Sequence, residues 1–353
     1  MILSTLFFKK VLKNFIDLLI VKIETGEYML NIVIIGAGQI GSRHLQAISK
    51  INRRVSVQVV DPSVENLLIA RQRFQDCQTP ETTVDVSYLH SINQLSGSID
   101  FAIIATNANV RRSVIEKLIA KCSVRYLLLE KFLFQKIEDI EYVNCLLNES
   151  NIKSWINCPL RMVPYYRKLQ LKFQNSKIYN FSVSGSLIGI GCNAIHYVDM
   201  LAYLTGRSDF TFTSTLFDKK IIESKRKGFI EFTGTLIGET SAGNRFTLFS
   251  YPEGEAPITI SIFSDSVRCI ICEKDSRCWI SEQKEGWSWQ EEKFMIPYQS
   301  QITHKVILDV LDTGTCDLPT YHESGKLHSE LLKTFCSYLK LYSFGNGDIC
   351  QIT

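Results

Sequence analysis

The sequence lacks a strong charge of either sign, a long apolar run and a metal-binding cysteine pattern. Its 39 basic and 36 acidic residues leave a formal net charge of only +3, which excludes the basic footprint of a nucleic-acid-binding protein. Of its eleven cysteines, Cys269 and Cys272 have metal-like spacing, but they fall in a strand-like run where residues three apart point to opposite faces. We therefore expect no nucleic-acid partner, no membrane span, no metal, and a reduced protein of the cytoplasm.

The composition is that of a globular protein. Hydrophobic residues make up 45% and charged residues 21% of the 353 positions, and this length allows two domains of ordinary size. The basic residues are dispersed. Their tightest groups, Lys219–Lys220 and 225–227, are expected on a solvated surface hairpin or loop.

Residues 1–28 stand apart from the rest of the sequence. They have helical apolar spacing, but lysines and Asp17 interrupt it, and no small-residue cleavage site follows. We interpret this segment as an upstream extension or as a misassigned start, with Met29 as the real one. The alternative is an amphipathic helix on a membrane surface.

A dinucleotide-binding motif follows Met29. Residues 31–35 form a continuous apolar run, typical of a strand buried on both faces of a parallel sheet. A GxGxxG motif and a helical pattern come directly after it, in the order that the motif requires. The glycines permit a tight turn, a close approach to a pyrophosphate and close helix–strand packing. The predicted cofactor-binding residues of this motif are Gly36, Ala37, Gly38, Gln39, Ile40 and Gly41.

The next strand, 55–60, ends on Asp61, 20 residues after Gly41. An acidic residue there hydrogen-bonds the adenosine ribose and would repel a 2′-phosphate, so the sequence favours NAD over NADP.

Strands and helices continue to alternate up to residue 129, which predicts an α/β domain with a doubly wound parallel sheet. Ligands bind beyond the carboxyl ends of such strands. The predicted cofactor-binding residues at those ends are Thr106, Asn107, Glu130 and Lys131.

The remainder of the sequence predicts an α+β domain. Residues 210–294 contain period-2 segments separated by hairpin signals, which indicate a large open, mostly antiparallel sheet. A helix is predicted from His196 to Leu204, and a capping box at 320–323 starts a final helix. We expect a Rossmann domain at 29–157 and a substrate and oligomerisation domain at 158–353.

With these features in place, residues 30–342 resemble the Gfo/Idh/MocA oxidoreductases. The family's Thr-Pro and Glu-Lys-Pro motifs match Thr106-Asn107 and Glu130-Lys131-Phe132, with both prolines missing. The Glu-Lys-Pro proline is commonly cis in the family. A cis bond before a residue other than proline costs about 3 kcal/mol, so a trans Lys131–Phe132 bond is the expectation.

The resemblance extends into the second domain. The family's Arg near the start of that domain matches Arg161. Its Asp, Gly and His at relative positions 0, 2 and 4 match Cys192, Ala194 and His196, and a trailing Asp matches Asp199. The resemblance further implies a homo-oligomer formed through one face of the second sheet.

For hydride transfer from a secondary alcohol, a base must take the hydroxyl proton and a cation or donor must polarise the forming carbonyl. The resemblance assigns catalytic roles to Lys131, to His196 as general base, and to Asp199, which orients the imidazole or acts on the substrate. The predicted substrate-binding residues are Lys131, Arg161, for an anionic group, Cys192, as apolar filler or a reactive thiol, Asn193 and His196.

Two functional hypotheses follow. The first is an NAD-dependent oxidoreductase acting on a secondary hydroxyl of a sugar or nucleotide-linked sugar, in surface-polysaccharide or sugar metabolism. The second is a non-catalytic dinucleotide- and sugar-binding sensor or regulator, suggested by the missing prolines and the missing leading Asp. Reduction of a non-sugar carbonyl or imine is a lesser alternative.

Deletion of residues 1–28 tests the proposed start. We expect a soluble, folded, NAD-binding protein, because the first strand begins after Met29. An insoluble product, or a folded one that no longer binds NAD in a calorimetric titration, would show that the extension is part of the fold.

Overall fold

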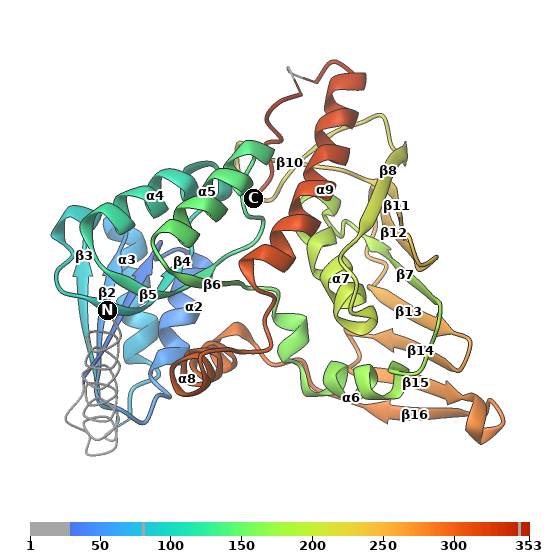
Figure 1. Cartoon of the computed structure of the whole chain (residues 1–353), viewed down its shortest axis with the longest axis horizontal. Coiled ribbons are helices and arrows are strands. Elements are labelled where there is room, and N and C mark those ends of the chain that lie inside the picture. The colour runs from blue at the N-terminus through green and yellow to red at the C-terminus, as the bar shows by residue number, and fades with distance from the viewer. Residues whose placement is uncertain (1–28, 80–81, 345–346) are drawn as a thin grey trace, which may run out of the picture.

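The computed structural model describes residues 29–79, 82–344 and 347–353. The predicted N-terminal extension lies outside these residues. The described chain forms two halves that lie side by side, the Rossmann half in blue to green and the second half mainly in yellow-green to orange (Figure 1).

The first half is a six-stranded parallel sheet in the order β3-β2-β1-β4-β5-β6. This is the predicted α/β arrangement, with the strand order reversing between β1 and β4. Its strands are β1 Leu30–Ile35, β2 Val55–Val60, β3 Val84–Leu89, β4 Ile99–Ile104, β5 Val124–Leu129 and β6 Lys153–Ile156. Its helices are α2 Gln39–Ile48, α3 Val64–Gln75, α4 Ala108–Lys121 and α5 Ile137–Glu149.

The sheet is buried on both faces. In β1, Val33 and Ile35 belong to a core cluster that contains buried residues of α4 and α5. Ile32 and Ile34 belong to the cluster that contains buried residues of α2 and α3. Since successive side chains of a strand point to opposite faces, helices on both sides explain why β1 reads as a continuous apolar run.

The second half is built on an eight-stranded sheet in the order β16-β15-β14-β13-β7-β12-β11-β8. Only the β7–β12 pair is parallel in this sheet, and the other neighbours are antiparallel. Helices α6 Pro164–Phe173, α7 Ile190–Thr205 and α9 Tyr321–Leu341 lie between this sheet and the Rossmann half (Figure 1). The strands are β7 Tyr179–Ser186, β8 Phe210–Phe217, β11 Gly234–Thr240, β12 Arg245–Tyr251, β13 Thr259–Ser264, β14 Val267–Cys272, β15 Arg277–Glu282 and β16 Trp289–Lys293.

Two segments position the candidate site. A separate two-stranded hairpin joins β9 Ile222–Glu223 to β10 Ile230–Glu231. Helix α8, Thr303–Thr313, returns to the first half, where Val306, Ile307 and Val310 join the cluster containing buried residues of α2 and α3. None of the helices in the described ranges is long and apolar enough to cross a bilayer.

The structure corrects the predicted start of helix α7. The helix begins at Ile190, so His196 lies in its second turn and not at its start. No side chain of its own caps the helix, and Gly189 precedes it with a φ of 77°. The usual local start signal of a Ser, Thr, Asp or Asn is therefore missing from the sequence.

Candidate active site

The glycine-rich turn has the geometry that dinucleotide binding requires. Gly36 has a φ of +99°, and a Cβ there would lie 2.8 Å from the Ala105 carbonyl carbon. A Cβ on Gly41 would lie 1.7 Å from the Gly36 oxygen. Both positions therefore require glycine. Nothing lies within 4 Å of a Cβ built on Gly38, so the N-terminus of α2 is open to a phosphate.

Asp61 lies against this turn. It is buried, and its carboxylate accepts hydrogen bonds from the Ala37 N–H at 2.7 Å and the Ser63 N–H at 2.8 Å. These bonds fix the carboxylate beside the glycine-rich turn, where the ribose is expected.

A cavity of about 670 Å³ lies between the two halves. It opens at the carboxyl ends of β1, β4 and β5, the edge where ligands bind in parallel sheets. On the opposite side it is lined by the N-terminus of α7 and by the β9–β10 hairpin. The predicted site residues that line it are Gly38, Gln39, Ile40, Thr106, Asn107, Glu130, Lys131, Cys192 and Asn193.

Lys131 connects the two walls of the cavity. Its Nζ donates to the Cys192 carbonyl and to Asn193 Oδ1, each at 3.0 Å. Asn193 in turn donates to the Ile188 carbonyl at 2.6 Å. An ammonium group has three donors, so one Lys131 N–H remains for a ligand in the cavity.

The turn after Lys131 differs from the sequence expectation. The Lys131–Phe132 peptide bond is cis, although the expected form was trans. The buried Arg111 guanidinium donates to the carbonyls of Phe132 and Leu133 in this turn and to that of Thr106. Sequence reasoning missed Arg111, because an arginine in the first turn of α4 carries no motif.

Glu130 is held by a buried network that was also missed. His44 Nε2 lies 2.9 Å from Glu130 Oε1, and Asn157 donates to the same oxygen at 2.5 Å. His44 Nδ1 lies 2.8 Å from Thr303 Oγ1 of α8. Burial alone would raise the pKa of Glu130, but His44, Asn157 and the charge of Lys131 hold that pKa below its ordinary value.

His196 lies one helical turn beyond Cys192 on the same face of α7. It is not among the residues that line the cavity. Its Nδ1 is buried and has no hydrogen-bond partner within the described part of the chain. Burial, together with the charges of Lys131 and His328, holds the pKa of His196 well below its ordinary value. The imidazole is therefore neutral at neutral pH and able to accept a proton.

Arg161 and Asp199 are paired with each other away from the cavity. Arg161 Nε lies 2.8 Å from Asp199 Oδ2, and Nη2 lies 2.7 Å from Oδ1. Both side chains are buried. Burial raises the pKa of Asp199 to about 6, against the opposing effect of Arg161. The pair thus joins Arg161 to α7, which contains Asp199, and neither residue lines the cavity. Roles in substrate binding or catalysis stay predictions for both residues.

Cys192 lines the cavity as a protonated thiol. Burial and the neighbouring Glu231 carboxylate raise its pKa to about 12. Reactive cysteines have depressed pKa values, so this environment favours the thiol as filler and not as a nucleophile.

The cluster Lys225, Arg226 and Lys227 forms the tip of the β9–β10 hairpin. The three residues are exposed, as the sequence suggests, but they also line the cavity. None of them forms an ion pair with another residue of the described ranges. The hairpin tip therefore contributes three cationic side chains to the cavity wall, which also contains Glu223.

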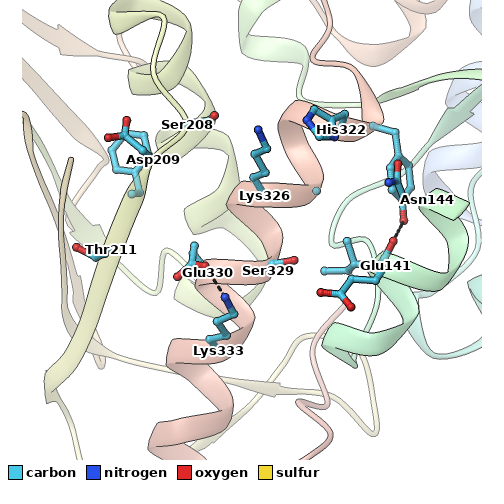
Figure 2. Close-up of a pocket in the computed structure, with 14 residues that line it drawn as sticks. Glu141, Asn144, Ser208, Asp209, Thr211, His322, Lys326, Ser329, Glu330 and Lys333 are labelled. Atoms are coloured by element: carbon cyan, nitrogen blue, oxygen red, sulfur yellow. Dashed lines mark hydrogen bonds and ion pairs between the residues drawn. The ribbon is translucent and has the colours of Figure 1, made fainter. Parts of the chain in front are cut away.

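A second hollow, of about 530 Å³, lies between α5, α9 and the start of β8. Figure 2 shows Lys326 and Lys333 of α9 on one wall, Glu141 of α5 on another and Asp209 at the start of β8. Its charges are mixed, Lys333 pairs with Glu330 at 2.6 Å, and no predicted site residue lies in it. We therefore assign the candidate site to the cavity between the halves.

The comparisons with known proteins identify the fold of the first half and its cofactor class. The family model described as "Oxidoreductase family, NAD-binding Rossmann fold", that of Gfo/Idh/MocA, matches residues 30–157. Residues 30–157 thus match the NAD-binding Rossmann domain of the Gfo/Idh/MocA oxidoreductase family. The match confirms the Rossmann fold and the NAD cofactor predicted from the glycine motif. No curated protein sequence matches the chain.

Solved structures of this fold are similar over most of their length. An oxidoreductase from Agrobacterium radiobacter, solved with NAD+, L-tartaric acid and magnesium, has 14% identity and a TM-score of 0.69, covering 88% of this chain and 96% of its own. UDP-N-acetylglucosamine 3-dehydrogenase GnnA from Acidithiobacillus ferrooxidans has 15% identity and a TM-score of 0.64, covering 87% and 97%. A super-repressor mutant of Gal80p from Saccharomyces cerevisiae has 14% identity and a TM-score of 0.67, covering 88% and 96%. At these identities the similarity shows the fold.

Replacing Asp61 tests the cofactor preference. Asp61→Ala should weaken NAD binding and reduce discrimination against NADP, because hydrogen bonds to a charged acceptor contribute about 1.5–3 kcal/mol each. Calorimetric titration of both dinucleotides measures this, with the exposed Asp85→Ala as the control. Tighter binding of NADP than NAD by the wild-type protein would contradict the assignment.

Proposed function

We propose that the protein is an NAD-dependent oxidoreductase that acts on a secondary hydroxyl of a sugar, and specifically of a nucleotide-linked sugar. The observation that carries this proposal is the position of Lys131. It lies in one cavity with the glycine-rich turn, and one of its donors is free of protein contacts. A donor at that position can bind the oxygen of the reacting carbon.

The residues around the glycine-rich turn fit NAD. The open space at Gly38, the start of α2 and the buried Asp61 would hold the pyrophosphate and the ribose. NAD, when bound, supplies the acceptor or donor of the hydride.

The proposed chemistry of the chain's own groups is proton handling. Lys131 donates a hydrogen bond to the hydroxyl or carbonyl oxygen of the substrate. The neutral His196 accepts the hydroxyl proton in oxidation and returns it in reduction. Its Nδ1 has no partner in the described residues, but His196 does not line the cavity, so this role requires the ring to reach the substrate directly or through one water.

The tip of the β9–β10 hairpin supports a nucleotide-linked substrate. Lys225, Arg226 and Lys227 would bind the diphosphate of such a sugar while its ring lies near Lys131. The structural similarity to GnnA, named as a UDP-N-acetylglucosamine 3-dehydrogenase, is consistent with this substrate class. The proposal includes a role in surface-polysaccharide or sugar metabolism in the cytoplasm, and a homo-oligomer formed through the second sheet.

Removal of either proton-handling group tests the reaction. Lys131→Ala and His196→Ala should each lower turnover by about 10²–10⁴-fold, the range for positioned acid–base groups. NAD affinity should change little, because its contacts lie at the glycine-rich turn and Asp61. The measurement is the absorbance of reduced nicotinamide with a panel of sugars and UDP-sugars.

The pH dependence of the same reaction follows from the lowered pKa of His196. A base must be deprotonated to accept a proton, so oxidative turnover should rise with pH through the pKa of His196. Because that pKa lies well below its ordinary value, the rise should be complete below about pH 6.5. Full turnover by both alanine variants would refute the assigned roles. Ligand binding without any turnover by the wild type would instead favour a sensor.

Removing the charges of the hairpin tip tests whether it binds the diphosphate. Replacing Lys225, Arg226 and Lys227 together with alanine should raise KM for UDP-sugars by about 10- to 100-fold, as expected for losing hydrogen bonds between charged groups. The kcat should stay nearly constant, because these groups bind the ground state and transition state equally. The control is Lys219→Ala with Lys220→Ala, which removes exposed charges that do not line the cavity. An equal KM in both variants would exclude the diphosphate contact.

A further inference from the structure

Glu231, at the base of the β9–β10 hairpin, places a buried carboxylate at the N-terminus of α7. It accepts hydrogen bonds from the Gly191 N–H at 2.7 Å and from the Cys192 N–H at 3.1 Å. Gly189 and Gly191 leave the space for it, because a Cβ on either residue would lie within about 3.1 Å of its oxygens. Glu231 is 6% exposed, and what it exposes lines the cavity.

Part of the role of Glu231 is to cap the helix. The first N–H groups of α7 have no acceptor in their own segment, and a carboxylate is favoured at the positive end of a helix. Capping does not account for its surroundings, however. The carboxylate shares the cavity with the Lys131 ammonium. Its two oxygens have about four acceptor sites, and the two α7 amides and the Cys192 thiol use three of them at most. Acceptor capacity therefore remains on the cavity side.

We infer that Glu231 is a substrate-binding carboxylate, which accepts a hydrogen bond from a hydroxyl of the sugar while Lys131 donates to the reacting oxygen. Together the two groups present one acceptor and one donor to neighbouring ring oxygens and so fix which C–H faces the cofactor. The nature of the ligand in this inference rests on the proposed function. The carboxylate comes from the hairpin, whereas Cys192 offers only a thiol at the start of α7.

The charge state of Glu231 depends on the groups around it. Burial raises its pKa above the ordinary value, against the opposing effects of the Cys192 thiol, the α7 amides and Lys131. Ligand affinity should therefore be full above this raised pKa and fall as the pH drops through it. The titratable or charged residues that face it or share the cavity wall are Arg111, Glu130, Lys131, Cys192, Glu223, Lys225, Arg226, Lys227 and Cys350.

Moving the carboxylate tests the inference. Sugars and UDP-sugars are titrated by calorimetry into the protein–NAD complex of the wild type, Glu231→Gln, Cys192→Asp, and the double variant. Glu231→Gln should weaken binding by about 10- to 100-fold, the loss expected for one hydrogen bond to a charged acceptor. Cys192→Asp alone should also weaken binding, because two carboxylates then repel each other. The double variant should recover much of the affinity, since it again has one carboxylate.

The matched control is Glu239→Gln, an exposed residue of β11 that does not line the cavity. A purely capping role predicts that Glu231→Gln lowers Tm but leaves ligand affinity and its pH dependence unchanged in the folded protein, and this result would overturn the inference. If the wild type turns over a substrate and Glu231→Gln binds that ligand with unchanged affinity, the role of Glu231 is rejected and the proposed function stands. Binding that depends on Glu231 without turnover would reject the proposed oxidoreductase and keep the inference. A panel in which nothing binds the wild type would reject both.

Discussion

The site depends on the contact between Lys131 and the first turn of α7. This lysine stands at the end of β5 in the Rossmann sheet, and its two 3.0 Å hydrogen bonds reach a backbone carbonyl and a side chain of the other half. The same bonds orient the ammonium and leave one donor directed to neither half. This contact joins the cofactor-binding edge to the α7 wall within the cavity itself.

Behind Lys131, a buried polar network keeps its neighbour in place. Glu130 is paired with His44 of α2 and Asn157, and His44 continues to Thr303 of α8. A buried carboxylate is costly unless it is paired and hydrogen-bonded. This cost explains why four groups from four separate segments converge on one point below the cavity. The network also connects the returning helix α8 to the strand end that carries Lys131.

The sequence predicts the fold and the cofactor-binding edge because their signals are local. The apolar runs, the glycine motif and Asp61 all lie within one stretch of chain. The other wall of the cavity is not local. Glu231 acts on residues 39 and 40 positions away, Arg111 on residues 21 and 22 positions away and His44 on one 86 positions away, and no motif connects them. The start of α7 was misplaced for the same reason, since its cap comes from a different hairpin. The paired glycines at 189 and 191 are the one local sign of a close neighbour.

The path of the chain between the halves has a mechanical consequence. The polypeptide leaves the Rossmann half after β6, returns as α8, leaves again for α9, and ends with its last residues against the first half, where the Thr353 hydroxyl accepts from the Ala108 N–H at 3.0 Å. Two halves that are joined by several polypeptide connections form a stiffer joint than two halves that are joined by one linker. Large opening of the cavity would have to stretch several connections together. The β9–β10 hairpin pairs with neither large sheet, so a shift of this wall on ligand entry would break no strand pairing of either sheet.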